Sequence, residues 1–116
     1  MTPPVLQGYG PGGFRISGAT VAGSVLLLPD RMLPWAAASL AEASAESLAP
    51  VIAAGDALDL LVLGTGQRFA LAPAGLVAAL RAVGVAVEAM DTAAACRTFP
   101  QLAAEGRRVA AALIAL

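Results

Sequence analysis

The chain has 116 residues, of which 59% are hydrophobic and 13% charged, and its formal net charge is −1. This length predicts one domain with one core, the hydrophobic content excludes a disordered chain, and the near-neutral charge offers no basic surface for nucleic acid. The absence of histidine excludes a Ser-His-Asp relay and a histidine-ligated metal, and the absence of lysine excludes a Walker-type phosphate loop. A single cysteine excludes an intrachain disulfide and a four-cysteine metal site.

The first half of the chain begins with a segment that is rich in glycine and proline. Residues 1–13 are therefore predicted to be an irregular N-terminal segment. Residues 14–16 alternate between apolar and polar side chains, and residues 21–28 end in a continuous apolar run. These two patterns predict an N-terminal β-hairpin that turns at residues 17–20. Pro29 closes the second strand, because proline cannot donate to a strand ladder.

A connection and a short helix follow. Within residues 30–44, Trp35 is interpreted as an anchor that holds the connection on the core rather than as a ligand-stacking residue. Pro50 is tolerated only in the first turn of a helix, so the helix is predicted to have its N-cap at Ser47 or later. It is predicted to end near Ala54.

The middle of the chain predicts a βαβ unit. Residues 58–63 form a continuous apolar run, which indicates a strand that is covered on both faces. Pro73 opens a helix that ends before Gly84, and residues 85–89 form a second strand. A strand, helix and strand in this order predict two parallel strands with a right-handed crossover.

The C-terminal part is predicted to be helical. A short helix is expected over residues 92–97, and a second helix is expected from residue 100 to about residue 115, with Glu105 and Arg108 paired on its outer face. The predicted fold over residues 1–116 is a layered single α/β domain around a mixed central sheet. It contains one βαβ unit, an N-terminal β-hairpin and a C-terminal helix.

The carboxyl ends of the two parallel strands define a candidate site, because ligands bind at this edge of open α/β sheets. Residues 64–68 could present backbone N–H groups to an anion, and residues 90–97 begin a helix whose N-terminus carries partial positive charge. Two arginines could add bidentate contacts. The candidate ligand-binding residues are Gly64, Thr65, Gly66, Arg68, Asp91, Thr92, Cys96 and Arg97.

A structural interpretation of the same residues stands beside the ligand hypothesis. The glycines permit a sharp turn after a buried strand, and Asp91 as a helix cap would compete with a bound anion. Cys96 lies near the helix start and Arg97, which would lower its pKa, but three preceding alanines favour packing in the core. Asp56 and Asp59 are interpreted as solvated residues at a strand entry rather than an acid–base pair.

Several motifs occur in a fixed order along the chain. They are Tyr9-Gly-Pro-Gly-Gly-Phe-Arg-Ile, Gly23-Ser-Val-Leu, Leu33-Pro-Trp, Leu63-Gly-Thr-Gly, Met90-Asp-Thr-Ala-Ala-Ala-Cys-Arg-Thr and Ala104-Glu-Gly-Arg-Arg-Val-Ala-Ala-Ala-Leu-Ile. Together they span about residues 7–114 and resemble the Mth938-like family of small domains of unknown function, which is named for an archaeal structural-genomics prototype. That family includes the mitochondrial respiratory complex I assembly factor three.

The resemblance implies a compact α/β domain in layers around a mixed sheet, without an established reaction, cofactor or catalytic residue. One motif departs from the family, which usually has Thr-Tyr-Asn where this chain has Thr98-Phe99-Pro100. The change removes a phenol hydroxyl and an amide. We expect this loss beside the candidate site.

Two functions from different classes follow. The first is a non-catalytic interaction module that binds an unidentified protein partner, comparable to an assembly factor for a respiratory or other complex, and its basis is analogy to relatives. The alternative is a small-anion or small-ligand binding protein or enzyme that uses residues 64–68 and 91–97. The low charged content predicts apolar surface patches and, with them, a homodimer.

Location is predicted from three features. The two longest stretches without Asp, Glu, Lys or Arg, residues 1–14 and 16–29, have 14 residues each and are too short for a membrane-spanning helix. The first residues lack the basic and apolar regions of a secretory signal, and one unpaired thiol is typical of a reducing compartment. We expect a cytoplasmic protein without a transmembrane segment or cofactor, and peripheral membrane association is left open.

Overall fold

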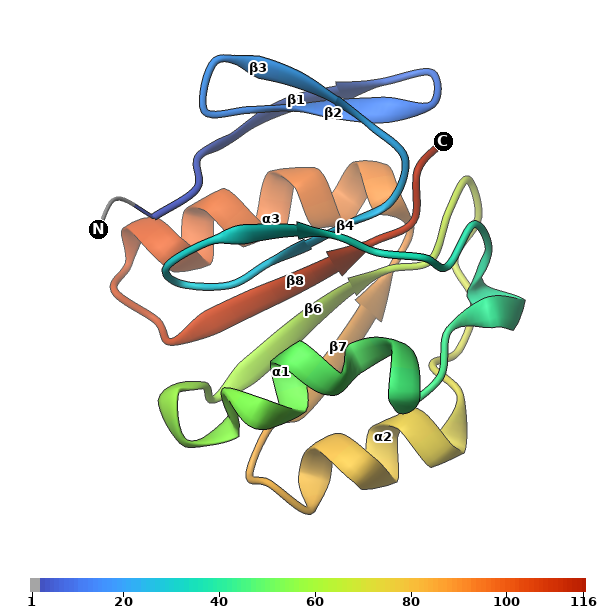
Figure 1. Cartoon of the computed structure of the whole chain (residues 1–116), viewed down its shortest axis with the longest axis vertical. Coiled ribbons are helices and arrows are strands. Elements are labelled where there is room, and N and C mark those ends of the chain that lie inside the picture. The colour runs from blue at the N-terminus through green and yellow to red at the C-terminus, as the bar shows by residue number, and fades with distance from the viewer. Residues whose placement is uncertain (1–2) are drawn as a thin grey trace.

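A mixed sheet of five strands forms the centre of the computed structural model, which describes residues 3–116 (Figure 1). In the spatial order β5-β4-β8-β6-β7, the strands are β5 (Met32–Pro34), β4 (Val25–Leu27), β8 (Val109–Leu113), β6 (Leu60–Gly64) and β7 (Ala86–Met90). β6 is parallel to β7 and to β8, whereas β4 is antiparallel to β5 and to β8. The predicted fold class, including its mixed central sheet, is therefore confirmed.

Helices cover both faces of this sheet. α1 (Ala49–Ala53) and α2 (Ala74–Arg81) lie on one face and α3 (Thr92–Ala104) on the other (Figure 1). Short 3₁₀ turns are found at Leu40–Glu42, Glu46–Leu48 and Gly55–Ala57. The succession β6–α2–β7 is the predicted βαβ unit, and the parallel pairing of its strands is confirmed.

A second, smaller sheet precedes the central one in the chain. Its three antiparallel strands are β1 (Leu6–Gly10), β2 (Gly13–Ile16) and β3 (Ala19–Ala22). The predicted hairpin is confirmed by the β2–β3 pair, which turns at Ser17 and Gly18. In Figure 1 this sheet lies above α3, and its inward side chains join the core on that side.

Two predictions for this N-terminal region are wrong. The segment 1–13 is not irregular throughout, because residues 6–10 pair with β2 as an edge strand, where glycine is tolerated; residues 1–2 lie outside the described part of the chain. The strand predicted over 21–28 is interrupted at Gly23, whose φ of +84° turns the chain. β3 and β4 consequently belong to different sheets.

The helix predicted from residue 100 to about residue 115 is also wrong. A helix does occupy the C-terminal part of the chain, but it is α3, which passes through Pro100 and ends at Ala104. The chain then turns at Gly106, with φ +79°, and continues as β8. All five β8 side chains are buried because the strand lies between two packed layers, and this burial overrides the helix propensity of alanine.

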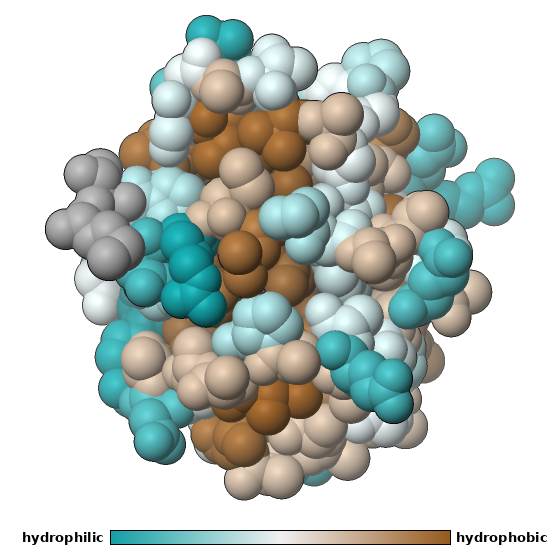
Figure 2. All heavy atoms as spheres, viewed as in Figure 1, coloured by the Kyte–Doolittle hydropathy of each residue, from teal (hydrophilic) through white to brown (hydrophobic). Residues whose placement is uncertain are grey.

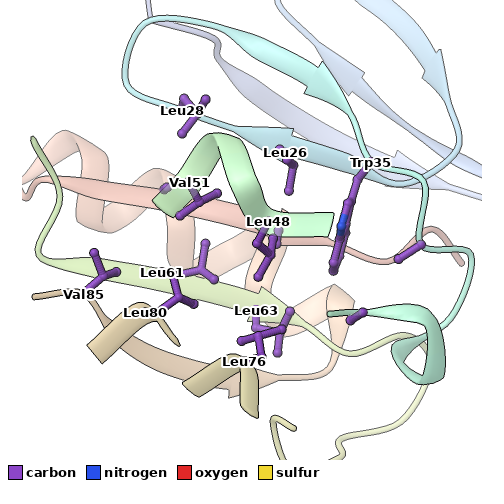
Figure 3. Close-up of a cluster of buried hydrophobic side chains, with 14 of the residues drawn as sticks. Leu26, Leu28, Trp35, Leu48, Val51, Leu61, Leu63, Leu76, Leu80 and Val85 are labelled. Carbon is purple, nitrogen blue, oxygen red and sulfur yellow. The ribbon is translucent and has the colours of Figure 1, made fainter. Parts of the chain in front are cut away.

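The central sheet separates the buried side chains into two cores. The first core lies between the sheet, α1 and α2 and includes Leu61 and Leu63 of β6 (Figure 3). The second core lies between the sheet, α3 and the small sheet and includes Leu60 and Val62. Alternate β6 residues thus enter opposite cores, as the two-residue period of a strand requires.

Trp35 is buried in the first core, which confirms its predicted role as an anchor (Figure 3). Its indole N–H donates to the Ser47 hydroxyl at 3.0 Å, and the same hydroxyl accepts the Ser44 N–H at 3.0 Å. The N-cap residue of α1 is Leu48, which has no side-chain cap. Ser47 therefore holds the tryptophan and does not cap the helix.

Candidate functional site

The candidate site lies at the edge of the central sheet where β6, β7 and β8 end. Because β6 is parallel to both neighbours, the carboxyl ends of all three strands meet there. The sequence predicts two of these strands at the edge but not β8, which adds the backbone of Ile114. The continuous apolar run over residues 109–114 was the available signal for this strand.

Thr92 lies at the centre of this edge and is fully buried. Its hydroxyl accepts the Gly66 N–H at 2.9 Å and donates to the Ile114 carbonyl at 2.8 Å, while its own N–H donates to the Gly66 carbonyl at 2.9 Å. The Ile114 N–H in turn donates to the Gly64 carbonyl at 3.0 Å. We call these four residues the threonine junction; it joins the ends of β6 and β8 to the start of α3.

The threonine junction explains why glycine occupies position 64. A Cβ there would lie 3.0 Å from the Thr92 hydroxyl oxygen and 3.1 Å from a methyl carbon of Leu113. Both neighbours are buried, so neither has free room to move. Gly66 has φ +109°, a backbone conformation that favours glycine.

Thr65 shapes the loop that leads from β6 to α2. Its N–H donates to the Met90 carbonyl at 2.8 Å, which continues the parallel ladder. Its hydroxyl donates to the Arg68 carbonyl at 2.7 Å and accepts the Ala70 N–H at 3.3 Å. One nearly buried side chain therefore holds the turn over residues 66–70.

Asp91 caps α3. Its carboxylate accepts the Ala94 N–H at 2.8 Å, and its carbonyl accepts the Ala95 N–H at 3.0 Å. With the Thr92 N–H directed to Gly66, the first turn of α3 already has acceptors for three of its four amides. The structural interpretation of Asp91 is confirmed by this geometry.

The remaining candidate residues differ in exposure. Arg68 and Arg97 are exposed, and neither takes part in an ion pair within residues 3–116. Cys96 is half-buried against the second core, and burial raises the pKa of its thiol to about 11 while the Arg97 charge opposes that rise. The thiol is thus protonated at neutral pH and does not have the lowered pKa of a reactive cysteine.

The structure brings most of the candidate residues together. Gly64, Gly66 and Thr92 form direct contacts, and Thr65 and Asp91 lie at the adjoining strand end and helix cap. Their polar groups bond to one another or to the neighbouring backbone. Ligand binding by Gly64, Thr65, Gly66, Arg68, Asp91, Thr92, Cys96 and Arg97 stays a prediction.

The residues that depart from the family motif, Phe99 and Pro100, do not lie beside the candidate site as expected. Phe99 and Pro100 lie in the second half of α3, and Phe99 is buried in the second core. With Pro3 and Pro4 they line a shallow hollow. At 1.5 Å per residue, Phe99 is about 10 Å along α3 from Thr92, so the missing hydroxyl and amide are not beside the candidate site.

An ion pair that the sequence did not reveal lies at the opposite edge of the sheet. Arg108, just before β8, binds Asp59, just before β6, through two contacts of 2.6 Å and 3.1 Å, and also donates to the Asp56 carbonyl at 3.2 Å. The hydrogen bond from Arg108 lowers the pKa of Asp59. The predicted Glu105–Arg108 pair is therefore wrong, because it depended on a helix that is not formed.

Within residues 3–116, no group of three or more Cys, Asp or Glu side chains is placed to hold a metal ion. No helix in that range is long and apolar enough to cross a membrane.

A mixed sheet with helices on both faces and a three-stranded sheet packed beyond α3 defines this chain as a small layered α/β domain. The family described as "Protein of unknown function (DUF498/DUF598)" matches residues 6–114. The chain belongs to this family, and the resemblance to Mth938-like domains is confirmed.

Relatives of known sequence support this assignment. An uncharacterized protein of Rhodobacter capsulatus is 41% identical over 109 residues, which are 94% of this chain and 82% of that protein. NADH dehydrogenase [ubiquinone] 1 alpha subcomplex assembly factor 3 of Danio rerio is 42% identical over 95% of this chain. The matched region is 63% of that assembly factor, so this chain spans less than two thirds of its length.

Solved structures show the same fold. The crystal structure of an outer membrane protein from Bartonella henselae has a TM-score of 0.92 and 31% identity, with 97% of this chain and 95% of that chain covered. A Mth938-like domain protein from Bordetella pertussis has a TM-score of 0.82 and 29% identity over 94% of this chain and 84% of that chain.

Proposed function

We propose that this protein is a non-catalytic interaction module that helps subunits of a respiratory or other complex to assemble. The single observation that carries the proposal is an exposed apolar loop tip beside the candidate site. Phe69 is 59% and Leu71 is 80% exposed, in a loop whose turn is held by the Thr65 hydroxyl. An ordered loop that presents large apolar side chains to solvent is typical of a protein-binding surface.

The hydrogen bonding of the polar side chains at the same sheet edge supports an interaction module rather than an enzyme. The hydroxyls of Thr65 and Thr92, which a reaction would need, are both bonded to the backbone. Within residues 3–116, no buried side-chain nitrogen or oxygen lacks a partner. The assembly-factor name of relatives that match almost the whole chain agrees with a role in assembly.

The rest of the surface offers further apolar area. Val5 is 53% and Tyr9 is 45% exposed. In Figure 2, hydrophobic residues form several separate areas on the viewed face, interrupted by hydrophilic side chains. Contacts of a transient partner are typically built from such mixed surfaces.

The proposal is tested in the native cell by deleting the gene and measuring the amount of assembled respiratory complex I on a native gel. The wild-type chain should restore the complex, whereas Phe69→Ser combined with Leu71→Ser should fail to restore it and should lose copurifying complex subunits. Gln67→Ser, at an exposed polar position of the same loop, is the matched control and should behave as wild type. A normal complex in the deletion strain, with no subunit retained by the tagged chain, would contradict the proposal.

Three finer parts of the proposal concern location and association. We propose a cytoplasmic location, because a single half-buried thiol suits a reducing compartment. We propose peripheral contact with a membrane surface beside the complex through exposed apolar residues outside the Phe69–Leu71 loop, such as Tyr9. We also propose self-association. Cell fractionation, vesicle flotation and sedimentation test these parts separately.

A second candidate function is the binding of a small anion at the same edge. Its support is the close approach of the Gly64–Gly66 turn to the start of α3, with exposed Arg68 and Arg97 nearby in the sequence. Phosphate titration followed by amide chemical shifts tests it. Saturable shifts at Gly66 and Ala93 are expected if an anion binds, and unchanged shifts at millimolar phosphate would end this hypothesis.

A further inference from the structure

A hollow of about 240 Å³ lies at the edge of the central sheet opposite the candidate site. It is bounded by the end of α3, the turn into β8, the chain after β4 and the N-terminal segment, which lie together in Figure 1. Its innermost walls are Leu28, Phe99 and Val109, whose exposures are 1%, 5% and 4%. These side chains are held by the packed cores, so the hollow has fixed apolar walls.

Two arginines line this hollow, and no acidic residue does. Arg108 is engaged with the protein itself, because its guanidinium binds the Asp59 carboxylate twice and donates to the Asp56 carbonyl. Arg107 is exposed, and within residues 3–116 it takes part in no ion pair. Its charge contributes to the lowered pKa of Asp59, so the two guanidiniums share the field of one carboxylate. Arg107 thus brings a positive charge to the hollow without an acidic partner of its own.

We propose that this hollow binds a small monocarboxylic acid with an apolar body, whose carboxylate pairs with Arg107. The buried walls favour a hydrocarbon body, because contact with them removes apolar surface from water. The planar guanidinium matches a carboxylate in charge and in geometry. An amine would be repelled by both arginines, and an uncharged molecule would leave Arg107 without a partner.

The volume of the hollow sets the size of the ligand. An apolar cavity of about 150 Å³ in another protein holds benzene, a molecule of six carbon atoms, so a hollow of about 240 Å³ holds about ten non-hydrogen atoms by proportion. Octanoate, a medium-chain fatty acid, has this size and this chemistry. The hollow and the Phe69 loop lie at opposite edges of the sheet, so this site is independent of the proposed role in assembly.

Titration of the full chain with sodium octanoate at pH 7, followed by amide chemical shifts, tests the site. Saturable shifts are expected at Phe99, Ala103, Arg107 and Val109, with a dissociation constant of about 1 mM or below. Octanol, which lacks the charge, should bind about two- to fivefold more weakly, and octylammonium more weakly still. Shifts that do not saturate, or an equal affinity for octanol, would overturn the proposal.

Ala103→Leu tests the location. Ala103 is an exposed residue of α3 that lines the hollow, so leucine there should fill the space and raise the octanoate dissociation constant about tenfold or more. The urea midpoint should not fall, because leucine is a good helix former. Gln101→Leu adds the same side chain at an exposed position of α3 outside the hollow and should bind octanoate as wild type does. Wild-type affinity in Ala103→Leu would overturn the assignment.

Arg107→Gln tests the charge. It should raise the octanoate dissociation constant about two- to fivefold and leave the octanol constant unchanged, because only the carboxylate uses the guanidinium. Arg15→Gln causes the same change of net charge at an exposed position of β2 outside the hollow and should alter neither constant. An octanoate affinity that is the same in Arg107→Gln as in the wild-type chain would show that the carboxylate does not pair with Arg107, and the proposal would fail.

Discussion

Gly66 and Thr92 bind each other twice, the Gly66 N–H donating to the Thr92 hydroxyl and the Thr92 N–H donating to the Gly66 carbonyl, each at 2.9 Å. They lie 26 residues apart in the chain. This reciprocal pair fixes the loop after β6 against the first turn of α3. At the sheet edge that the sequence predicts as a candidate ligand site, these two hydrogen bonds hold the backbone of the loop in one position.

Thr92→Val should destabilise the protein by about 2–5 kcal/mol, because the Gly66 N–H and the Ile114 carbonyl would both be left buried without a partner. Thr92→Ser keeps the hydroxyl and loses one methyl group, so it should cost about 1 kcal/mol. Urea unfolding measures both values. Equal losses for the two variants would show that packing, and not the hydrogen bonds, gives Thr92 its importance.

Gly64→Ala should destabilise the protein by about 1–3 kcal/mol, because the added methyl would press on Thr92 and Leu113. Gly75→Ala is the control. Position 75 lies in α2 with nothing within 4 Å of an added Cβ, and alanine there should stabilise the helix by about 0.5–1 kcal/mol. Thermal unfolding of the two variants should therefore shift in opposite directions, and a neutral Gly64→Ala would contradict the close approach.

Cys96 should react with iodoacetamide about 10²-fold more slowly than a free thiol at pH 8, because burial raises the pKa of its thiol to about 11. The folded pKa exceeds the unfolded one, so the associated stability is complete below about pH 8.5 and is lost as the pH rises toward 11. Mass spectrometry measures the rate, with urea-unfolded protein as the control. Rapid alkylation of the folded chain at pH 8 would contradict the burial of the thiol.

The Asp59–Arg108 pair should stabilise the protein at neutral pH and lose its effect in acid. The hydrogen bonds from Arg108 lower the pKa of Asp59 in the folded state. The contribution of the pair to the free energy of unfolding is therefore present above the ordinary carboxyl pKa and is lost as the pH falls below about 4. Arg108→Gln should lower the urea midpoint at pH 7 more than at pH 3. Glu105→Gln should leave the midpoint unchanged at both values, and an effect as large as that of Arg108→Gln would contradict the assigned partner.

Local sequence patterns were sufficient for the middle of the chain. The apolar run before Gly64, the proline at the start of α2 and the β-branched run near Val87 each agree with the element that forms there. For this reason the parallel edge and the meeting of the Gly64 turn with Asp91 and Thr92 could be predicted. In this region short-range preference and long-range packing favour the same structure.

The two ends of the chain could not be predicted from local patterns. Ala110–Ala112 have high helix propensity, and only their position between two layers makes them a strand. Gly8 and Gly10 lower the strand propensity of residues 6–10, so the sequence does not predict β1. Pairing with β2 makes this segment a strand. Two contacts depend on β8: the hydrogen bond from Thr92 to the Ile114 carbonyl, and the ion pair of Arg108 with Asp59. Neither contact can be predicted unless β8 is predicted as a strand.

The position of β8 between β4 and β6 has a consequence for biosynthesis. During translation, the pairs β4–β5 and β6–β7 emerge first, and neither can be joined to the other until residues 109–113 leave the ribosome. Until then each pair exposes an unmatched inner edge, a state that invites aggregation. Completion of the native topology therefore waits for the insertion of β8 between the two pairs.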